Sequence, residues 1–325
     1  MKRTSISAAF LLAASFGAAQ AQAQVPDYPT KPIRLIVATA PGGLMDIPAR
    51  LYSEYADRTG AQRIVVENRG GAGGNLGVEA VAKAAPDGYT LGFIQLGNVA
   101  INPFLFKDMG FDVLNDLAPV APITSSAILI SISSKVPATN LREFIALAKK
   151  DPGSMNHGTA GMGTVPHLAA ELFSTMSGVK LTQVHYKGAG PALADLIGGQ
   201  VQVIFSGYGV VRQQAAAGNV RVLAVGQKTR LAGAPNIPTM EEAGLPGYDV
   251  STWFGVVAPK GTPDRIVSTL SRQIHAMQDD PAVQKRLTEG GLEVLKESPA
   301  EFGARIRRDY DKYRDIVKAA GLKAE

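Results

Sequence analysis

Residues 33–46 read IRLIVATAPGGLMD, a short β-branched run that ends in a glycine-rich turn. Ile33 to Val37 predicts a buried strand, because a short aliphatic run bounded by turn residues is typical of a strand covered on both faces. The turn leads into a predicted helix over Ala49 to Ala56. The same order repeats, with a strand at Arg63 to Glu67, a helix at Leu76 to Ala84 and a strand at Tyr89 to Gln95. This alternation predicts βαβ units and a parallel sheet.

A second series of strands and helices begins near Ala127. Its first predicted strand is Ile128 to Ile132, and Asn140 with Glu143 predicts a capping box for a helix over Leu141 to Lys150. Further strands are predicted at Gln183 to Tyr186, Val201 to Phe205 and Val220 to Val225, and helices at Pro166 to Met176, Pro191 to Ile197 and Val210 to Ala217. The predicted fold class is therefore α/β, with two doubly wound α/β domains.

The chain ends in a predicted amphipathic helix. Ser298 and Glu301 have the spacing of a capping box around Pro299. One face of that helix carries apolar and aromatic residues at helical spacing: Phe302, Ile306, Tyr310, Tyr313 and Val317. We therefore expect the tail to pack back on the first domain.

The length of the chain, 325 residues, indicates two domains at about 150 residues per domain. No long linker separates the two series, so we expect tight crossovers between the domains. Domain 1 is predicted to be discontinuous, formed by residues 24–124 plus 252–325, and domain 2 to be residues 125–251. The absence of cysteine excludes a disulfide framework and a lipid-modified N-terminal cysteine.

Residues 1–23 have the pattern of a secretory signal peptide. Lys2 and Arg3 precede an apolar stretch from Ile6 to Ala19, which is shorter than the roughly 18 residues that span a membrane. Small-x-small sites follow, and cleavage after Ala21 or after Ala23 fits the pattern. A membrane anchor is the alternative. No later segment is apolar enough to cross a bilayer, so no direct membrane insertion is expected.

Charge gives little sign of a nucleic-acid partner. Two of the 33 basic residues lie in the signal segment, so 31 remain against 28 acidic residues, a net charge of +3. The densest basic pairs, Arg307-Arg308 and Lys149-Lys150, lie inside predicted helices. Such scattered pairs indicate solvated helix faces, because nucleic-acid binding needs a clustered stripe.

Motifs for catalysis and cofactor binding are missing. Gly71 to Gly77 resembles a dinucleotide fingerprint, but its sixth position is Leu76 and its last glycine comes one place late. The four histidines have no metal-ligand spacing, and Ser206, which ends a predicted strand, has no identifiable base. We therefore expect no catalytic residue, no metal site and no cofactor.

Two glycine-rich strand-to-helix turns, residues 40–46 and residues 157–164, have the composition of anion sites. Free N–H groups at the start of a helix favour an anion, and glycine lets a ligand approach the backbone. A plain tight turn is the alternative for each. Neither turn carries arginine or lysine, which favours a small carboxylate over a phosphate or nucleotide.

Besides these two turns, the chain carries a series of short motifs from near its start to near its end. They are Pro32 to Val37 with Pro41-Gly42-Gly43 and Asp46, Glu67-Asn68-Arg69, Gly71 to Gly77, Pro86 to Leu91, Gly158 to Leu168, Tyr186 to Ala192, Asp195 to Val201, Pro235 to Gly247, Trp253 and Ala258 to Pro263. In this order and nearly end to end, the mature chain resembles the Bug-type (TctC-like) periplasmic solute receptors of the tripartite tricarboxylate transporter family.

The resemblance implies a monomeric periplasmic binding protein of the Venus flytrap type. Its two domains would close on a small carboxylate in the cleft between them and deliver it to membrane permease subunits, without catalysis. Carried over by position, the ligand-binding residues are Gly42, Gly43 and Asp46 in the first domain, Thr159, Ala160, Gly161, Gly163, Thr164 and His167 in the second, and Asn98, Asp195 and Ser206. Asp46 and Asp195 would repel a carboxylate, so we expect them to orient waters, N–H groups or ligand donors. The alternative for Asp46 is a first-turn residue favoured by the helix dipole.

Departures from the family pattern bear on the ligand. Leu44 and Met45 replace small or polar residues, and Gln202 and Ser206 stand where many relatives have aspartate. They indicate a ligand less polar than an amino acid, such as an aromatic or short aliphatic acid, with family drift as the alternative. Two other functions stay open: a receptor for a sensor kinase, and a secreted α/β enzyme acting on a carboxylate.

Overall fold

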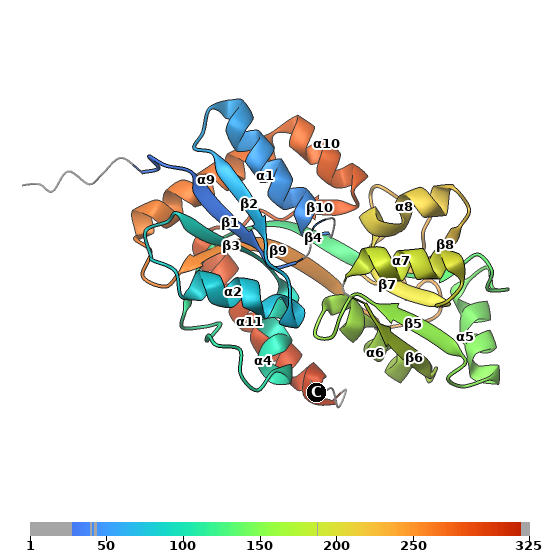
Figure 1. The fold of residues 1–325 in the computed structure, drawn as a ribbon. Helices are drawn as coiled ribbons and strands as arrows, with labels where there is room; N and C mark the ends of the chain where they lie inside the picture. Colours follow the sequence, from blue (N-terminus) through green and yellow to red (C-terminus); the bar gives the residue numbers. More distant parts are fainter. Residues whose placement is uncertain (1–27, 40, 42–43, 187, 320–325) are drawn as a thin grey trace, which may run out of the picture.

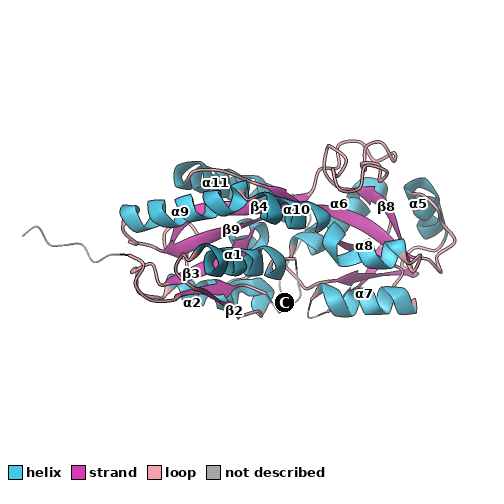
Figure 2. Ribbon diagram, turned by 90° about the horizontal axis from the view of Figure 1, so that it is seen from above, coloured by secondary structure: helices cyan, strands magenta, loops and turns pink. Residues whose placement is uncertain are grey.

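The computed structural model describes residues 28–39, 41, 44–186 and 188–319. They form two lobes that lie side by side (Figure 1). The strands run through the middle of both lobes, and helices cover both faces (Figure 2). The predicted signal peptide, residues 1–23, and the turn residues Gly42 and Gly43 lie outside the described residues.

The first lobe contains the beginning and the end of the chain's described part. Its strands are β1 (Ile33–Val37), β2 (Ile64–Asn68), β3 (Thr90–Gln95), β9 (Ser251–Pro259) and β10 (Leu292–Val294). Its helices are α1 (Asp46–Thr59), η1 (Ala72–Gly74), α2 (Asn75–Ala82), α3 (Leu96–Ala100), α4 (Asn102–Leu105), α9 (Asp264–Asp279), α10 (Pro281–Glu289) and α11 (Pro299–Ala319).

The second lobe is built from the middle of the chain. Its strands are β5 (Met155–Thr159), β6 (Leu181–His185), β7 (Val203–Gly207) and β8 (Val220–Val225), and its helices are α5 (Leu141–Lys150), α6 (Val165–Ser177), α7 (Ala189–Gly198) and α8 (Tyr208–Ala216). Asn140 caps α5 by accepting a hydrogen bond from the Glu143 N–H at 3.0 Å, which confirms this half of the predicted capping box. The Glu143 carboxylate bonds back to the N–H of Thr139, at 2.7 Å, rather than to that of Asn140.

A 17-residue strand, β4 (Leu117–Ser133), joins the lobes. Up to Ala127 it pairs with β9, and from Ile128 onward it pairs with β7 and β8. The strand order is β2-β1-β3-β9-β4-β7-β5-β6, with β8 and β10 also paired to β4. The chain recrosses between β8 and β9, where the Gly226 N–H donates to the Ile128 carbonyl at 2.7 Å. The division into residues 24–124 plus 252–325 and residues 125–251 stays a prediction.

The predicted parallel sheet is wrong in part. β1, β2 and β3 are parallel, as are β5, β6 and β7, but β4 and β9 run antiparallel to their neighbours. The sequence predicted only Ile128 to Ile132 of β4. Pro119 and Pro122 hid its first half, and the register of β4 against β9 shifts beside each of them, as strands do around proline.

Helix α11 packs on the sheet of the first lobe, as its apolar face predicted. Phe302 is fully buried against the bare backbone of Gly255, and its ring meets Trp253 edge-on with centroids 5.1 Å apart. The Trp253 indole N–H donates to Asp309 of the same helix at 2.7 Å. None of the helices in the described part of the chain combines the length and apolar character that crossing a bilayer requires.

We expect Phe302→Ala to lower the free energy of unfolding by about 3–5 kcal/mol, because the surrounding sheet and helix cannot collapse into the space of the ring. Urea unfolding measures the loss. Met176→Ala, which shortens a side chain 37% exposed at the end of α6, should change stability by less than about 0.5 kcal/mol. Equal losses in the two variants would contradict the assignment of Phe302 to the core.

Candidate functional site

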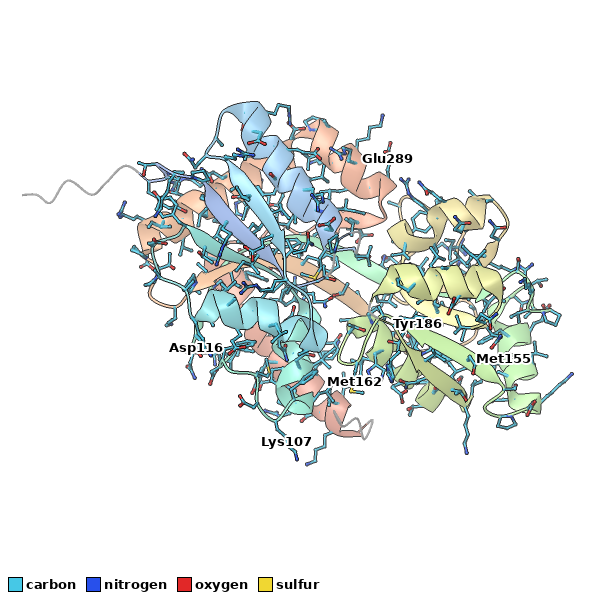
Figure 3. The ribbon with its side chains drawn as sticks, viewed as in Figure 1. Lys107, Asp116, Met155, Met162, Tyr186 and Glu289 are labelled. Atoms are coloured by element: carbon cyan, nitrogen blue, oxygen red, sulfur yellow. The ribbon has the colours of Figure 1, made fainter. Side chains whose placement is uncertain are left out.

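Two connected chambers lie where the lobes meet. The smaller has a volume of about 280 Å³ and the larger about 740 Å³. Both are lined by residues from both lobes, and five residues line both chambers: Thr39, Gln95, Ala160, Thr164 and Gly188. The chambers are therefore parts of one cleft. Met162 and Tyr186, which line the larger chamber, lie on the side of the second lobe that faces the first (Figure 3).

The described lining residues carry no charged side chain. The walls of the smaller chamber are mostly apolar: Pro41, Leu44, Met45, Ile128, Pro166, Pro191, Val210 and Phe254. Its polar side chains are neutral: Thr39, Gln95, Thr164, Ser206 and Thr252. A charged ligand in this chamber would depend on peptide dipoles and hydroxyl groups.

Four helices of eight or more residues begin at the smaller chamber. Their N-cap residues, which all line it, are Met45 of α1, Thr164 of α6, Gly188 of α7 and Gly207 of α8. At none of these ends does the cap side chain accept a hydrogen bond from the helix N–H groups. The first turn of a helix leaves N–H groups without internal partners and carries about half a positive charge. The chamber is thus suited to an anion without any cationic side chain.

The turn before α6 is held in place by hydrogen bonds to side chains on the side away from the cleft. The Thr164 hydroxyl donates to the Gly161 carbonyl at 2.7 Å, and the Gly163 N–H approaches Nδ1 of His167 at 3.4 Å. His167 is 5% exposed and lines neither chamber. Thr159 is fully buried, and its hydroxyl lies 3.4 Å from the Gly161 N–H. His167 and Thr159 therefore position the turn, whereas Ala160, Gly161 and Thr164 form the surface of the cleft.

Neutral imidazole rings support this turn. Burial, and next the charge of His185, lowers the pKa of His167 to about 4. Burial, and next His167 and His185, lowers the pKa of the neighbouring His157 to about 3. Near neutral pH both rings are uncharged, so Nδ1 of His167 is able to accept a hydrogen bond from Gly163.

On the first lobe, Asn98 holds residues that line the cleft. It is fully buried, its amide oxygen accepts from the Gln95 N–H at 3.1 Å, and its amide nitrogen donates to the Gly73 carbonyl at 2.9 Å. Gln95 lines both chambers, and Gly73 lines the larger one. Gln95 was not predicted from the sequence, although its place at the carboxyl end of a parallel strand is where ligands bind in α/β sheets.

The two predicted aspartates lie behind the cleft wall. Asp46 is buried at the start of α1, where its carboxylate accepts hydrogen bonds from Arg50 at 2.8 Å and Asn68 at 3.0 Å. Asp195 accepts a hydrogen bond from the Tyr186 hydroxyl at 2.6 Å. Burial, and next this hydrogen bond, raises the pKa of Tyr186 to about 12, so the hydroxyl stays protonated. Neither carboxylate lines a chamber.

Four of the predicted residues therefore line the described part of the cleft: Ala160, Gly161, Thr164 and Ser206. Asp46, Asn98, Thr159, Gly163, His167 and Asp195 lie around it without lining it. Their roles toward a ligand stay predictions, as do those of Gly42 and Gly43. Further lining residues that were not predicted from the sequence include Gly188, Thr252 and Phe254. Gly188 follows a strand and opens a helix, so the rule applied to the other glycine turns would have found it.

Glycine residues, which have no side chain, let the backbones of the two lobes approach each other closely. A methyl group added at Gly209 of α8 would lie 2.7 Å from the carbonyl oxygen of Gly290 in the first lobe. One added at Gly97 would lie 3.0 Å from the carbonyl oxygen of Gly163 in the second. Leu44 fills the space that a side chain at Gly207 would need. This closeness of the lobes requires glycine at those positions.

Known proteins resemble this chain along most of its length. The family model described as "Tripartite tricarboxylate transporter family receptor" matches residues 49–322. A UPF0065 protein of Bordetella bronchiseptica is 35% identical, covering 99% of this chain and 94% of that protein. The solved structure of Rpa4515 from R. palustris with adipate is 34% identical with a TM-score of 0.88, covering 91% of this chain and all of that chain. MatC from Rhodopseudomonas palustris with bound malate is 32% identical with a TM-score of 0.83, covering 89% of this chain and all of that chain. These likenesses confirm the predicted fold class of two α/β domains.

We expect the free energy of unfolding to be about 3–4 kcal/mol lower at pH 5 than at pH 7 because of His157 and His167. Their folded-state pKa values of about 3 and about 4 lie below the unfolded value of about 6.5. The unfolded chain therefore takes up protons first as the pH falls below 6.5, and stability is lost from there down to the folded-state values. Urea unfolding at both pH values measures the difference, and His157→Leu should reduce it by about half. A difference of the same size in that variant would contradict the prediction.

Proposed function

The chain belongs to the family of tripartite tricarboxylate transporter receptors, and on that premise we propose that it captures a small carboxylate in its cleft for a permease. The receptors of this family are solute-binding proteins of the periplasm. The observation that carries the proposal is the meeting of four helix N-termini at a chamber whose described lining has no charged side chain.

The chemistry of the lining favours a carboxylate over a phosphate. A charge-assisted hydrogen bond contributes roughly 1.5–3 kcal/mol, so a few peptide N–H groups are enough for micromolar affinity, about −8.2 kcal/mol. A phosphate usually adds a lysine or an arginine fork, and neither lines the described part of the cleft. Adipate and malate, the compounds in the Rpa4515 and MatC structures, are carboxylates.

The same lining disfavours an amino acid. An ammonium group needs a carboxylate or several carbonyl groups in a site shielded from water. Asp46 and Asp195 are engaged by other side chains and line neither chamber. The walls formed by Leu44, Met45 and Phe254 fit an aliphatic or aromatic body. We therefore propose a carboxylic acid without an amino group.

Delivery follows from closing of the lobes around this acid. We propose that residues 24–124 plus 252–325 and residues 125–251 move as two bodies about β4 and the recrossing near Gly226. Residues 1–23 would direct the chain to the periplasm and be removed there, leaving a monomer that presents the closed form to permease subunits. Binding and release complete this role without catalysis.

A panel of carboxylates tests the function. We expect aliphatic and aromatic acids at 100 times their dissociation constant to stabilise the protein by about 2.7 kcal/mol, measured as a thermal shift. Aspartate and glutamate should give a smaller shift at equal concentration, because the described lining has no carboxylate to pair with their ammonium group. A preference for these two amino acids would reject the proposed ligand class, and no shift with any acid would reject the function.

Gly190→Val tests the place of binding. Gly190 lines the smaller chamber in the first turn of α7, and beyond its own helix no described atom lies within 4 Å of an added Cβ. The added side chain should leave the fold intact and weaken binding of the best acid in the panel at least tenfold. Ala194→Val, at an exposed position of the same helix, is the matched control and should bind normally. Normal binding by Gly190→Val would mean that α7 does not hold the acid.

Gly209→Ala separates closing from contact with the ligand. Alanine suits the helical backbone of α8, but its methyl group would lie 2.7 Å from the Gly290 carbonyl of the other lobe. We expect a melting temperature without ligand no lower than that of the wild type, because alanine favours a helix over glycine and the open lobes leave room for the methyl group. The affinity should be at least tenfold lower, measured by calorimetry. Gly198→Ala, at the end of α7 with its nearest neighbour at 4.0 Å, should bind like the wild type. Equal affinity in both variants would mean that closing does not require this contact.

A further inference from the structure

Two of the helices that begin at the smaller chamber share a sequence pattern but differ in their surroundings. The pattern Gly-x-Gly covers the N-cap and the first two residues of α7, residues 188–190, and of α8, residues 207–209. Both N-cap glycines line the chamber. Because glycine has no side chain, the residues that lie beside each helix start decide what can approach it.

The start of α7 faces open space. Apart from its chain neighbours and its own helix, no described atom lies within 4 Å of a Cβ atom added at Gly188 or at Gly190. Both residues line the smaller chamber, and no side chain caps this end of the helix. An acid group therefore has room to approach the first-turn N–H groups of α7.

The start of α8 is covered by Leu44 of the opposite lobe. A Cβ atom added at Gly207 would lie 2.8 Å from Cδ2 of Leu44 and closer still to Cδ1, and one added at Gly209 would lie 3.7 Å from Cδ2. The end of the Leu44 side chain thus occupies the space in which a side chain at the N-cap of α8 would begin. A capping serine or aspartate carries an oxygen for the first-turn N–H groups. Leu44 brings methyl groups there instead.

The neighbours of this contact are apolar as well. Ile128 lies opposite Gly207 in the β4–β7 ladder, and Val210 is the third residue of α8. Leu44, Ile128 and Val210 line the smaller chamber and do not line the larger one. The described walls of the smaller chamber also contain no charged side chain. Its α8 end therefore suits a hydrocarbon group.

We infer that Leu44 determines specificity in the smaller chamber by keeping a second acid group away from α8. The inference rests on the proposed function and narrows the ligand to an acid with one carboxylate, held at an open helix start such as that of α7, and a hydrocarbon end at Leu44. A second carboxylate beside Leu44 would exchange water for methyl groups, which is unfavourable. The first carboxylate would also repel it, with no cation in the described walls to offset the repulsion.

Pairs of acids that differ only at the far end test the inference. We would measure dissociation constants by calorimetry for butanoate and succinate, pentanoate and glutarate, and hexanoate and adipate. The tightest acid of the wider panel and its counterpart with a second carboxylate form a fourth pair. In the pair that binds most tightly, the monoacid should bind at least tenfold more tightly than the diacid.

Leu44→Ala should lower this ratio of affinities at least tenfold. The shorter side chain takes a contact away from the hydrocarbon end of the monoacid, and it uncovers the start of α8 for the second carboxylate of the diacid. The melting temperature without ligand shows whether the variant is folded.

Two control variants separate the cover over α8 from the size of the chamber. Leu44→Met keeps an apolar side chain of similar volume beside Gly207, so the ratio should stay within threefold of the wild type. Phe254→Leu enlarges the chamber from β9, a strand at whose wall position no helix begins. Its ratio should also stay within threefold.

Three outcomes would overturn the inference: diacids that bind as tightly as monoacids in every pair, a ratio that survives in Leu44→Ala, or a ratio that falls as far in Phe254→Leu as in Leu44→Ala. In each of them acids still bind, so the proposed function stands. If no acid of these pairs or of the wider panel binds, the proposed function fails and the inference fails with it.

Discussion

The proposed binding of an acid in the cleft depends on the peptide N–H groups at the starts of four helices. Helices α1, α6, α7 and α8 each begin at the smaller chamber without a side-chain cap. Such ends need a partner from outside the helix, and an acid group is a suitable one. The other polar side chains around the cleft serve this arrangement. Asn98, Thr159 and His167 hold turns from behind, and Asp46 and Asp195 are engaged within their own lobes.

The second constraint is that one sheet continues through both lobes. β4 changes partners from β9 to β7 and β8 between Ala127 and Ile128, so the floor of the cleft is made of strands. Ile128, Ser206 and Thr252 come from three of these strands and line the same chamber. The floor therefore combines residues that are far apart in the sequence and that lie on either side of the point where β4 passes from one lobe to the other.

Local signals in the sequence predicted the elements that depend on local interactions. The helix Leu141 to Lys150 was found from Asn140 and Glu143, and the start of α11 from Ser298 and Glu301, whose side chains do form the expected caps. β9 and the first half of β4 were missed, because their pairing is long-range and antiparallel and Pro119 and Pro122 read as breaks. Both require knowledge of the partner strand.

The candidate site was predicted less completely than the fold, for a similar reason. Sequence position brought Asp46, Asn98 and His167 close to the cleft, but it does not show on which side of a wall a side chain lies. Gln95, Thr252 and Phe254 were missed, since an isolated residue at a strand end or on a long-range strand has no motif. Glycine turns were the most reliable signal: Ala160, Gly161 and Thr164 do line the cleft.

The uncapped helix starts bear on how such proteins diversify. Every amino acid except proline has a peptide N–H, so point mutation rarely deletes the groups that would grip the acid. The side chains of the wall, including Leu44, Val210 and Phe254, would not bind the carboxylate, so they are free to vary. Under the proposed mode of binding, lineages that inherit this scaffold would exchange one acid for another through single substitutions in the wall, while the peptide N–H groups that hold the carboxylate remain.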